Sequence, residues 1–265
     1  MTLKAAATQT PAGTLRATAL LYRRLARQQL RSPLSAVNLL IALFFLAVYD
    51  GAFGHAGAIN ALVGGSFLRF ILPVTILNAS ISGTSAGQLL VADLEAGYLR
   101  RLLTMPISRT SLVLAPMLVG ASSVIAQAAV VELLGIALGA GSATGAAGWL
   151  VVLALALLWG LAFAGYSVAS GLLAGNAAAA QTATFIFFPL TFLAPTFLPL
   201  SDLEGWLRIA SYANPTTYVL EGMRSVLIHG WQPGRLAIAF AVVAAMCALT
   251  LLWAARTALR QTSRR

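Results

Sequence analysis

The chain has very few of the side chains that most catalytic and metal sites need. Among 265 residues it contains one cysteine, Cys247, and two histidines, His55 and His229. A single cysteine excludes a disulfide framework and a thiolate metal site within one chain. A phosphate-binding loop needs the pattern G-x-x-x-x-G-K-[ST], and no such glycines precede the one lysine, Lys4. We therefore expect no ATPase activity, no metal and no cofactor in this chain.

Charge is also scarce, and its placement is more informative than its sum. Charged residues make up only 9% of the sequence and hydrophobic residues 59%, whereas soluble domains are about 25% charged. The formal net charge of +10 would suit a nucleic-acid partner. However, the basic residues crowd the edges of apolar runs instead of forming one basic face. The composition therefore predicts an integral membrane protein that binds lipid and no nucleic acid.

Long apolar stretches define the expected architecture. A helix needs about 20 apolar residues to cross the hydrocarbon core. Six stretches of the sequence meet this requirement: 34–53, 67–91, 110–137, 148–173, 178–198 and 235–256. The connections between them are too short to fold alone. We therefore expect residues 1–265 to form a single all-α, polytopic membrane domain with six transmembrane helices.

Basic residues gather on one side of these spans. Six crossings put both termini on the same side, and thirteen of the seventeen basic residues fall there. They are Lys4, Arg16, Arg23, Arg24, Arg27, Arg31, Arg100, Arg101, Arg109, Arg256, Arg260, Arg264 and Arg265. Because cytoplasmic loops carry the excess of arginine and lysine, we expect a multi-pass protein of the inner or plasma membrane with both termini in the cytoplasm.

Residues 14–32 precede the first span and have the pattern of an amphipathic helix. Four arginines fall along one side and four apolar residues along the other. They are Arg16, Arg23, Arg27 and Arg31, against Leu15, Leu21, Tyr22 and Leu25. One interpretation is an interfacial helix that anionic lipid attracts to the membrane surface. The other is a contact with a cytosolic partner, in addition to the contact expected for loop 93–109, and the sequence leaves both open.

The fifth stretch, 178–198, combines prolines with phenylalanines. Pro189, Pro195 and Pro199 are expected to bend or break its helix near the outer end. Three aromatic residues of this stretch are expected to give it an apolar surface: Phe185, Phe188 and Phe192.

Segment 200–230 is expected to form a re-entrant helical hairpin on the outer side. Its charged groups would make a full crossing costly. Asn214 can cap the second helix of the hairpin, with Pro215 at the first helical position. Glu221 and Arg224 are spaced to pair on one face of that helix.

A serine-hydrolase pattern, G-x-S-x-G, occurs at Gly83-Thr84-Ser85-Ala86-Gly87. The pattern needs a strand–turn–helix context and a histidine base. Both histidines are expected in outer loops, whereas Ser85 falls toward the cytosolic end of the second span. The same glycines suit close helix packing, so we favour a packing role over a membrane-embedded enzyme.

Two charged residues, Arg69 and Glu132, lie near the outer boundaries of their spans. They do not form the chain of acids and histidines that relays protons. A secondary transporter would also show inverted repeats, and no convincing repeat is found, so this alternative is less favoured. Structural and functional roles for Arg69 and Glu132 stay open.

Loop 93–109, between the second and third stretches, is dense in charge and also has an apolar face. Its apolar residues give a short helix one apolar side: Leu94, Leu99, Leu102, Leu103 and Ile107. A solvated connection needs no such face. The loop is therefore expected to contact a partner.

The same loop resembles that of ABC transporter permeases of the type-2 subclass. From Gly97 to Arg109 it matches their pattern G-x-L-x-x-L-L-x-x-P-x-x-R, preceded by an acid. A second segment, Asn214-Pro215-Thr216-Thr217-Tyr218 followed by Glu221 and Arg224, is similar to the family's N-P-x-x-Y…E-x-x-R before the last span. Within the family, the sequence looks most like the daunorubicin-resistance type of drug exporter permease. It departs at Ala115-Pro116, where relatives often carry Gly-Lys.

The resemblance implies a transport subunit and not an enzyme. Segment 93–108 would be the coupling helix that docks on a cytosolic P-loop ATPase subunit, and that subunit would bind ATP and magnesium. The implied coupling residues are Glu95, Gly97, Leu99, Arg100, Arg101, Leu102, Leu103, Pro106 and Arg109. The implied outer-hairpin residues are Asn214, Pro215, Tyr218, Glu221 and Arg224.

The resemblance also implies a second permease copy or a close relative, with the cargo passing between the two halves. Phe185, Phe188 and Phe192 would then line the translocation path, since apolar walls suit an apolar or amphiphilic cargo. The expected cargo is a hydrophobic or amphiphilic molecule, such as a drug, an antibiotic or a lipid-like compound, that leaves the cytoplasm. A lipid-linked glycan is the alternative cargo.

Overall fold

The computed structural model describes residues 11–98, 109–176, 178 and 182–263. Within these ranges the chain is helical and contains no strand. In chain order the elements are α1 (Pro11–Leu30), α2 (Pro33–Phe53), α3 (Gly57–Leu62), α4 (Phe67–Ala79), η1 (Ser80–Thr84), α5 (Ser85–Glu95), α7 (Arg109–Ala137), α8 (Ala146–Ala174), η2 (Ala183–Ile186), α10 (Phe187–Phe192), η3 (Leu200–Asp202), α11 (Gly205–Ala213), α12 (Pro215–Arg224), η4 (Ser225–His229) and α13 (Pro233–Ser263). The η elements are short 3-10 turns, except η4, which is a π turn.

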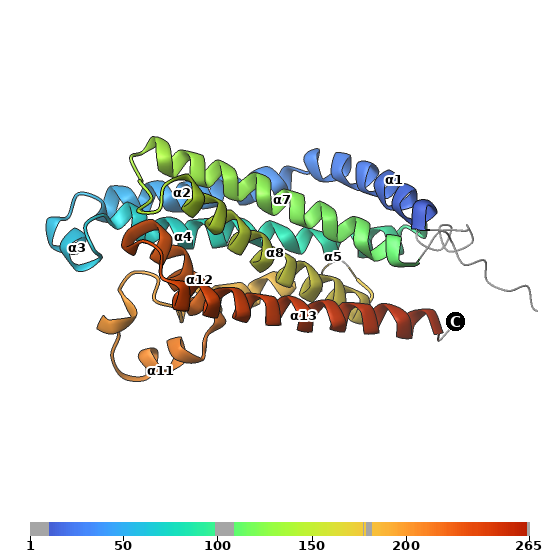
Figure 1. The fold of residues 1–265 in the computed structure, drawn as a ribbon. Helices are drawn as coiled ribbons and strands as arrows, with labels where there is room; N and C mark the ends of the chain where they lie inside the picture. The colour runs from blue at the N-terminus through green and yellow to red at the C-terminus, as the bar shows by residue number, and fades with distance from the viewer. Residues whose placement is uncertain (1–10, 99–108, 177, 179–181, 264–265) are drawn as a thin grey trace, which may run out of the picture.

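Five helical stretches in the described ranges are long and apolar enough to cross a membrane. They are Ser35–Phe53, Phe67–Glu95, Leu114–Ala137, Ala146–Ala174 and Pro233–Thr257. Figure 1 shows the helices that contain them running along the long axis of one bundle. The prediction of an all-helical, multi-pass membrane protein is thus confirmed for five of the six expected spans.

The predicted fifth span, 178–198, is not one continuous helix. Among its described residues, η2 and α10 cover 183–192, and residues 193–199 are not helical. Pro195 and Pro199 explain the interruption, because each lacks a backbone N–H and disfavours helical dihedrals in the residue before it. The expected count of six transmembrane helices is therefore not confirmed. The chain between α8 and α11 nevertheless joins opposite ends of the bundle (Figure 1).

Each end of the bundle carries a different set of elements (Figure 1). The end of α5, the start of α7, the start of α1 and the end of α13 lie together at one end. The short helices α3 and α11 lie at the other end. The two described chain ends are therefore on one side, as an even number of crossings requires. That this side is cytoplasmic stays a prediction from the arginine asymmetry.

The second span, α4–η1–α5, forms the centre of the bundle. Most of it is buried, and Ile71, Leu72 and Ile76 are completely enclosed. By contrast, little of α2 and little of α13 is buried in the single chain. These two helices are apolar, so their exposed sides must contact lipid or another subunit.

The glycines of the G-x-S-x-G pattern lie at the contact between the second span and α8. A Cβ atom at Gly83 would overlap the carbonyl oxygen of Gly160, and one at Gly87 would overlap Ser167. Ser167 Oγ donates a hydrogen bond to the Thr84 carbonyl at 2.7 Å. The packing interpretation of these glycines is confirmed, because the two backbones approach too closely for any side chain.

Gly87→Ala is therefore expected to destabilise the protein by about 1–3 kcal/mol, the usual cost of overpacking a core. The measurement is the thermal unfolding midpoint of the purified protein in detergent. Gly51→Ala in α2 is the matched control, since a Cβ atom there meets no heavy atom within 4 Å. Equal midpoints for both variants would contradict the packing role.

Candidate functional site

The predicted coupling segment, 93–108, begins inside a long helix. Asp93 and Glu95 belong to the last turn of α5, so the first residues of the segment are not part of a separate short helix. Gly97 follows with φ of +69°, a left-handed conformation that favours glycine and ends the helix. Arg109 is the first residue of α7. The other predicted coupling residues lie outside the described residues: Leu99, Arg100, Arg101, Leu102, Leu103 and Pro106.

An ion pair joins the start of this segment to the N-terminal helix. Arg24 of α1 donates two hydrogen bonds to Asp93 of α5, from Nη1 to Oδ2 at 2.6 Å and from Nη2 to Oδ1 at 2.8 Å. The same guanidinium lies over the ring of Tyr98, 3.8 Å from its centroid. Together, the two parallel hydrogen bonds and the stacked ring fix the orientation of the guanidinium and its distance from the carboxylate. The hydrogen bonds from Arg24 to Asp93 also raise the pKa of the guanidinium, which stays charged.

The apolar face of α1 packs on protein. Leu25 is buried against Leu89 of α5 and against Ala115 and Val119 of α7, with Leu21, Tyr22 and Ala26 beside them. Leu21, Tyr22 and Leu25 of the predicted apolar face therefore pack on α5 and α7, whereas Leu15 of the same face is exposed. Arg16, Arg23, Arg27 and Arg31 are exposed, as the amphipathic pattern predicts. Helix α1 thus presents its arginines outward and holds Asp93 with Arg24.

The second candidate site is the motif Asn214–Arg224, which forms α12 near the opposite end of the bundle (Figure 1). Asn214 caps the helix as predicted: its Oδ1 accepts a hydrogen bond from the Thr216 N–H at 2.9 Å, and Pro215 occupies the first helical position. Tyr218 donates its hydroxyl to the Tyr212 carbonyl at 2.7 Å. The motif therefore ties α12 to α11.

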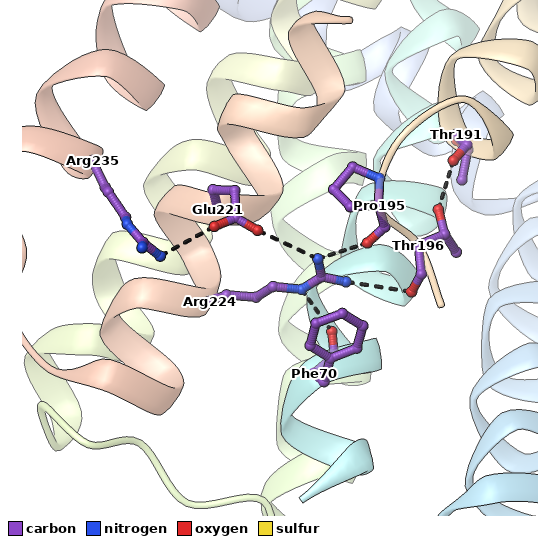
Figure 2. A network of polar contacts seen from close by, with 7 residues as sticks. All are labelled: Phe70, Thr191, Pro195, Thr196, Glu221, Arg224 and Arg235. Atoms are coloured by element: carbon purple, nitrogen blue, oxygen red, sulfur yellow. Dashed lines mark hydrogen bonds and ion pairs between the residues drawn. The ribbon is translucent and has the colours of Figure 1, made fainter. Parts of the chain in front are cut away.

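Arg224 is the centre of a buried polar network (Figure 2). Its side chain is 2% exposed. Nε donates to the Phe70 carbonyl of α4 at 3.1 Å, and Nη1 donates to the Pro195 carbonyl at 2.7 Å. The guanidinium also stacks on the Phe70 ring, 3.4 Å from its centroid. A buried arginine without such partners would be strongly destabilising, so these contacts explain how the charge is tolerated.

Glu221 connects the network to the last span. Its carboxylate lies 3.7 Å from Arg224 Nη1, which confirms the predicted pair, and 3.1 Å from Arg235 Nη1 at the start of α13. Figure 2 shows Glu221 between the two arginines. One acidic side chain therefore links α12 to α13 while it faces the buried guanidinium.

Loop 138–145 holds the turn that follows α12. The hydroxyls of Ser142 and Thr144 donate to the Val226 carbonyl at 3.1 and 3.0 Å. The Ala143 N–H donates to the Leu227 carbonyl at 3.1 Å. These donors supply partners to η4, whose π geometry disrupts the regular helical hydrogen bonds.

The predicted path residues lie on the interrupted fifth stretch. Phe185 is 64% exposed and Phe192 is 59% exposed in the single chain. The side chain of Phe188 lies outside the described part of the structure. Nearby, the ring of Phe197 contacts Tyr49 of α2 edge-on at 5.4 Å between centroids. The stretch therefore offers an apolar surface that the single chain leaves uncovered.

The sequence predicted the helix cap and the ion pair of the second motif but gave no roles to Arg24, Asp93, Ser211 or Thr196. Two signals were available for the first pair. Arg24 lies about 100° from its neighbour Arg23 around the helix, and Asp93 is one of only seven acidic residues, at the end of an apolar span. For Ser211 and Thr196, whose partners are backbone carbonyls, the sequence contains no such signal.

Comparison with known proteins agrees with both motifs. A family model described as ABC-2 type transporter matches residues 16–228. The chain is 27% identical over 210 residues to the "Putative transport permease ycf38" of Porphyra purpurea, covering 78% of this chain and 72% of the relative. It is 26% identical over 213 residues to the protein of the same name from Cyanophora paradoxa, covering 79% and 73%. Since the family model covers most of its length, the chain belongs to the ABC-2 type transporter family.

Proposed function

We propose that the chain is the permease subunit of an ATP-driven exporter that moves a hydrophobic or amphiphilic molecule, of the drug, antibiotic or lipid type, out of the cytoplasm. The observation that carries this proposal is the family match over residues 16–228 in a chain without a P-loop. A transporter of this family that lacks its own nucleotide site needs separate ATPase subunits. Those subunits would bind the ATP and magnesium.

The bidentate contact of Arg24 with Asp93 supports docking of the ATPase at segment 93–108. The contact joins α1 to the helix that leads into segment 93–108. A force applied to that segment would therefore reach α1 and α7 as well as the second span. We propose that the coupling residues act there, with the leucines as buried contacts and the charges of Glu95, Arg100, Arg101 and Arg109 at the rim.

A second permease copy, or a close relative, would complete the path. The exposed apolar surfaces of α2, α13 and the interrupted fifth stretch support this part of the proposal. Apolar walls of this kind suit an apolar or amphiphilic cargo. The exposed Phe185 and Phe192 would contribute to those walls, together with Phe188.

The test is reconstitution of the permease in liposomes, alone and with a candidate P-loop ATPase from the same genome. We expect no ATP hydrolysis by the permease alone and cargo-stimulated hydrolysis with the partner. If the complex exports a lipid-linked glycan but no drug-like apolar compound, the cargo is the glycan and the proposed cargo class is wrong. Transport driven by an ion gradient without ATP would establish a secondary transporter and overturn the proposal.

The proposed orientation predicts a labelling pattern. In a Cys247→Ser background, Asp202→Cys should react with a membrane-impermeant maleimide added outside cells, and Thr262→Cys should not. The reason is that thirteen of seventeen basic residues fall on the side of the termini, and such residues stay in the cytoplasm. The reverse labelling pattern would contradict the orientation.

A further inference from the structure

The interruption of the fifth stretch leaves backbone carbonyls that need hydrogen-bond donors. A helix that ends leaves its last four carbonyls without intrahelical partners, and lipid cannot supply donors. Here backbone N–H groups of Leu193 and Ala194 donate to the Pro189 and Thr191 carbonyls, and side chains supply further donors. Asn214 Nδ2 donates to the Leu190 carbonyl, Ser211 Oγ to the Leu193 carbonyl at 2.7 Å, and Thr196 Oγ1 to the Thr191 carbonyl at 2.6 Å.

Arg224 supplies donors for two further carbonyls of the interruption, those of Pro195 and Thr196. Nη1 donates to Pro195 at 2.7 Å and Nη2 donates to Thr196 at 3.3 Å, while Nε is engaged by Phe70. One planar guanidinium thus contacts the interruption and α4 at the same time (Figure 2). Lysine cannot reproduce this arrangement, because its ammonium presents three donors at a single point.

The donors from outside the interruption all come from the outer hairpin. Ser211 lies in the last turn of α11, Asn214 caps α12 and Arg224 ends α12. Helix α12 is in turn held by the Glu221–Arg235 pair and packs closely on α13, where Gly222 meets Ala239. The interruption is therefore fastened to the hairpin and, through it, to the last span.

We propose that Arg224 is a positioning residue for transport: with Ser211 and Asn214 it clamps residues 190–196 to α12, so that the hairpin and the interrupted stretch move as one body beside the cargo path. This inference rests on the proposed permease function. It gives a mechanical role to the arginine of the second motif, since the clamp sets where the exposed Phe192 stands relative to the path. Loss of the clamp separates the movement of the hairpin from that of the path wall.

The experiment uses the permease with its ATPase partner in membranes and a cysteine reporter at Ala194. Ala194 is small, 3% exposed and inside the interruption, so Ala194→Cys in a Cys247→Ser background should react slowly with an impermeant maleimide. Arg224→Lys should raise the labelling rate about tenfold through local opening. It should also lower the amount of cargo moved per ATP by about fivefold or more, since charge-assisted hydrogen bonds are lost.

Arg208→Lys is the matched control, because Arg208 is an exposed arginine on α11 of the same hairpin. It should leave the labelling rate and the transport ratio at wild-type values. Wild-type labelling of the reporter in the Arg224→Lys variant would overturn the clamp.

If Arg224→Lys does not fold, the double variant Ser211→Ala with Asn214→Asp decides the question. It removes two donors, keeps the capping oxygen of residue 214 and leaves Arg224 in place. Raised labelling of the reporter supports the clamp, and unchanged labelling overturns it. A wild-type complex that moves no cargo under ATP would refute the proposed function, whereas the labelling rates would still decide whether the clamp exists.

Discussion

Arg24→Ala is expected to destabilise the junction of α1 and α5 by about 2–4 kcal/mol and to uncouple ATP hydrolysis from transport. The substitution leaves the Asp93 carboxylate, which is only 13% exposed, without its two donors. Removing one partner of a buried ion pair costs about 3–5 kcal/mol. The expected value is somewhat lower because Arg24 itself is 38% exposed, and water screens the pair.

The measurement combines the unfolding midpoint of the purified permease with cargo-stimulated ATP hydrolysis in the reconstituted complex. Arg23→Ala is the matched control, because it removes one positive charge from the adjacent, exposed position of α1. Arg24→Lys keeps the charge but loses the bidentate geometry and the flat contact with Tyr98. Its unfolding midpoint and its cargo-stimulated hydrolysis should therefore lie between those of Arg24→Ala and Arg23→Ala. Equal behaviour of Arg24→Ala and Arg23→Ala would show that the ion pair contributes nothing to coupling.

Replacing both Leu102 and Leu103 by alanine is expected to abolish stable binding of the ATPase partner or to uncouple it. Each leucine contributes roughly 1.5–3 kcal/mol if it is fully buried on docking, so the double variant loses several kcal/mol of contact. The substitution leaves every charge in place. Topology therefore stays as in the wild type, whereas changes at Arg100 or Arg101 would also disturb the positive-inside signal.

Co-purification of the ATPase and cargo-stimulated hydrolysis at matched expression are the two readouts. The control is the double variant of Leu114 and Leu118 to alanine, which removes the same volume from exposed positions on α7. It should bind and hydrolyse like the wild type. Wild-type results in both assays for the Leu102 and Leu103 variant would place docking elsewhere and would point to the exposed arginines of α1.

The two variants separate docking from positioning. The leucine variant should release the ATPase, because the contact itself is lost. The Arg24 variant should retain the ATPase and lose only the coordinated movement, because the docking face is intact. A complex that co-purifies with normal yield but hydrolyses ATP without cargo transport is the expected signature of the broken Arg24–Asp93 pair.

Much of the architecture follows from one-dimensional patterns. Span length against bilayer thickness located α2, α4–α5, α7, α8 and α13, because an apolar helix of about 20 residues has no other stable place. The cap at Asn214 and the Glu221–Arg224 pair also followed from spacing, since both join residues within one turn of a helix. The prolines of the fifth stretch indicated a bend or break near its outer end, but only the structure shows that residues 193–199 leave the helix.

The sequence by itself determined the class of this protein: a helical, multi-pass membrane domain with a charged loop and a capped helix of known family pattern. Only the tertiary structure decided that α1 packs on α5 and α7, that Arg24 pairs with Asp93, and that Arg224 binds Phe70, Pro195 and Thr196. The physical reason is separation along the chain. Spans, caps and neighbouring ion pairs depend on residues within a few turns, whereas these contacts join residues between 28 and 154 positions apart, and such partners are chosen by how the helices pack.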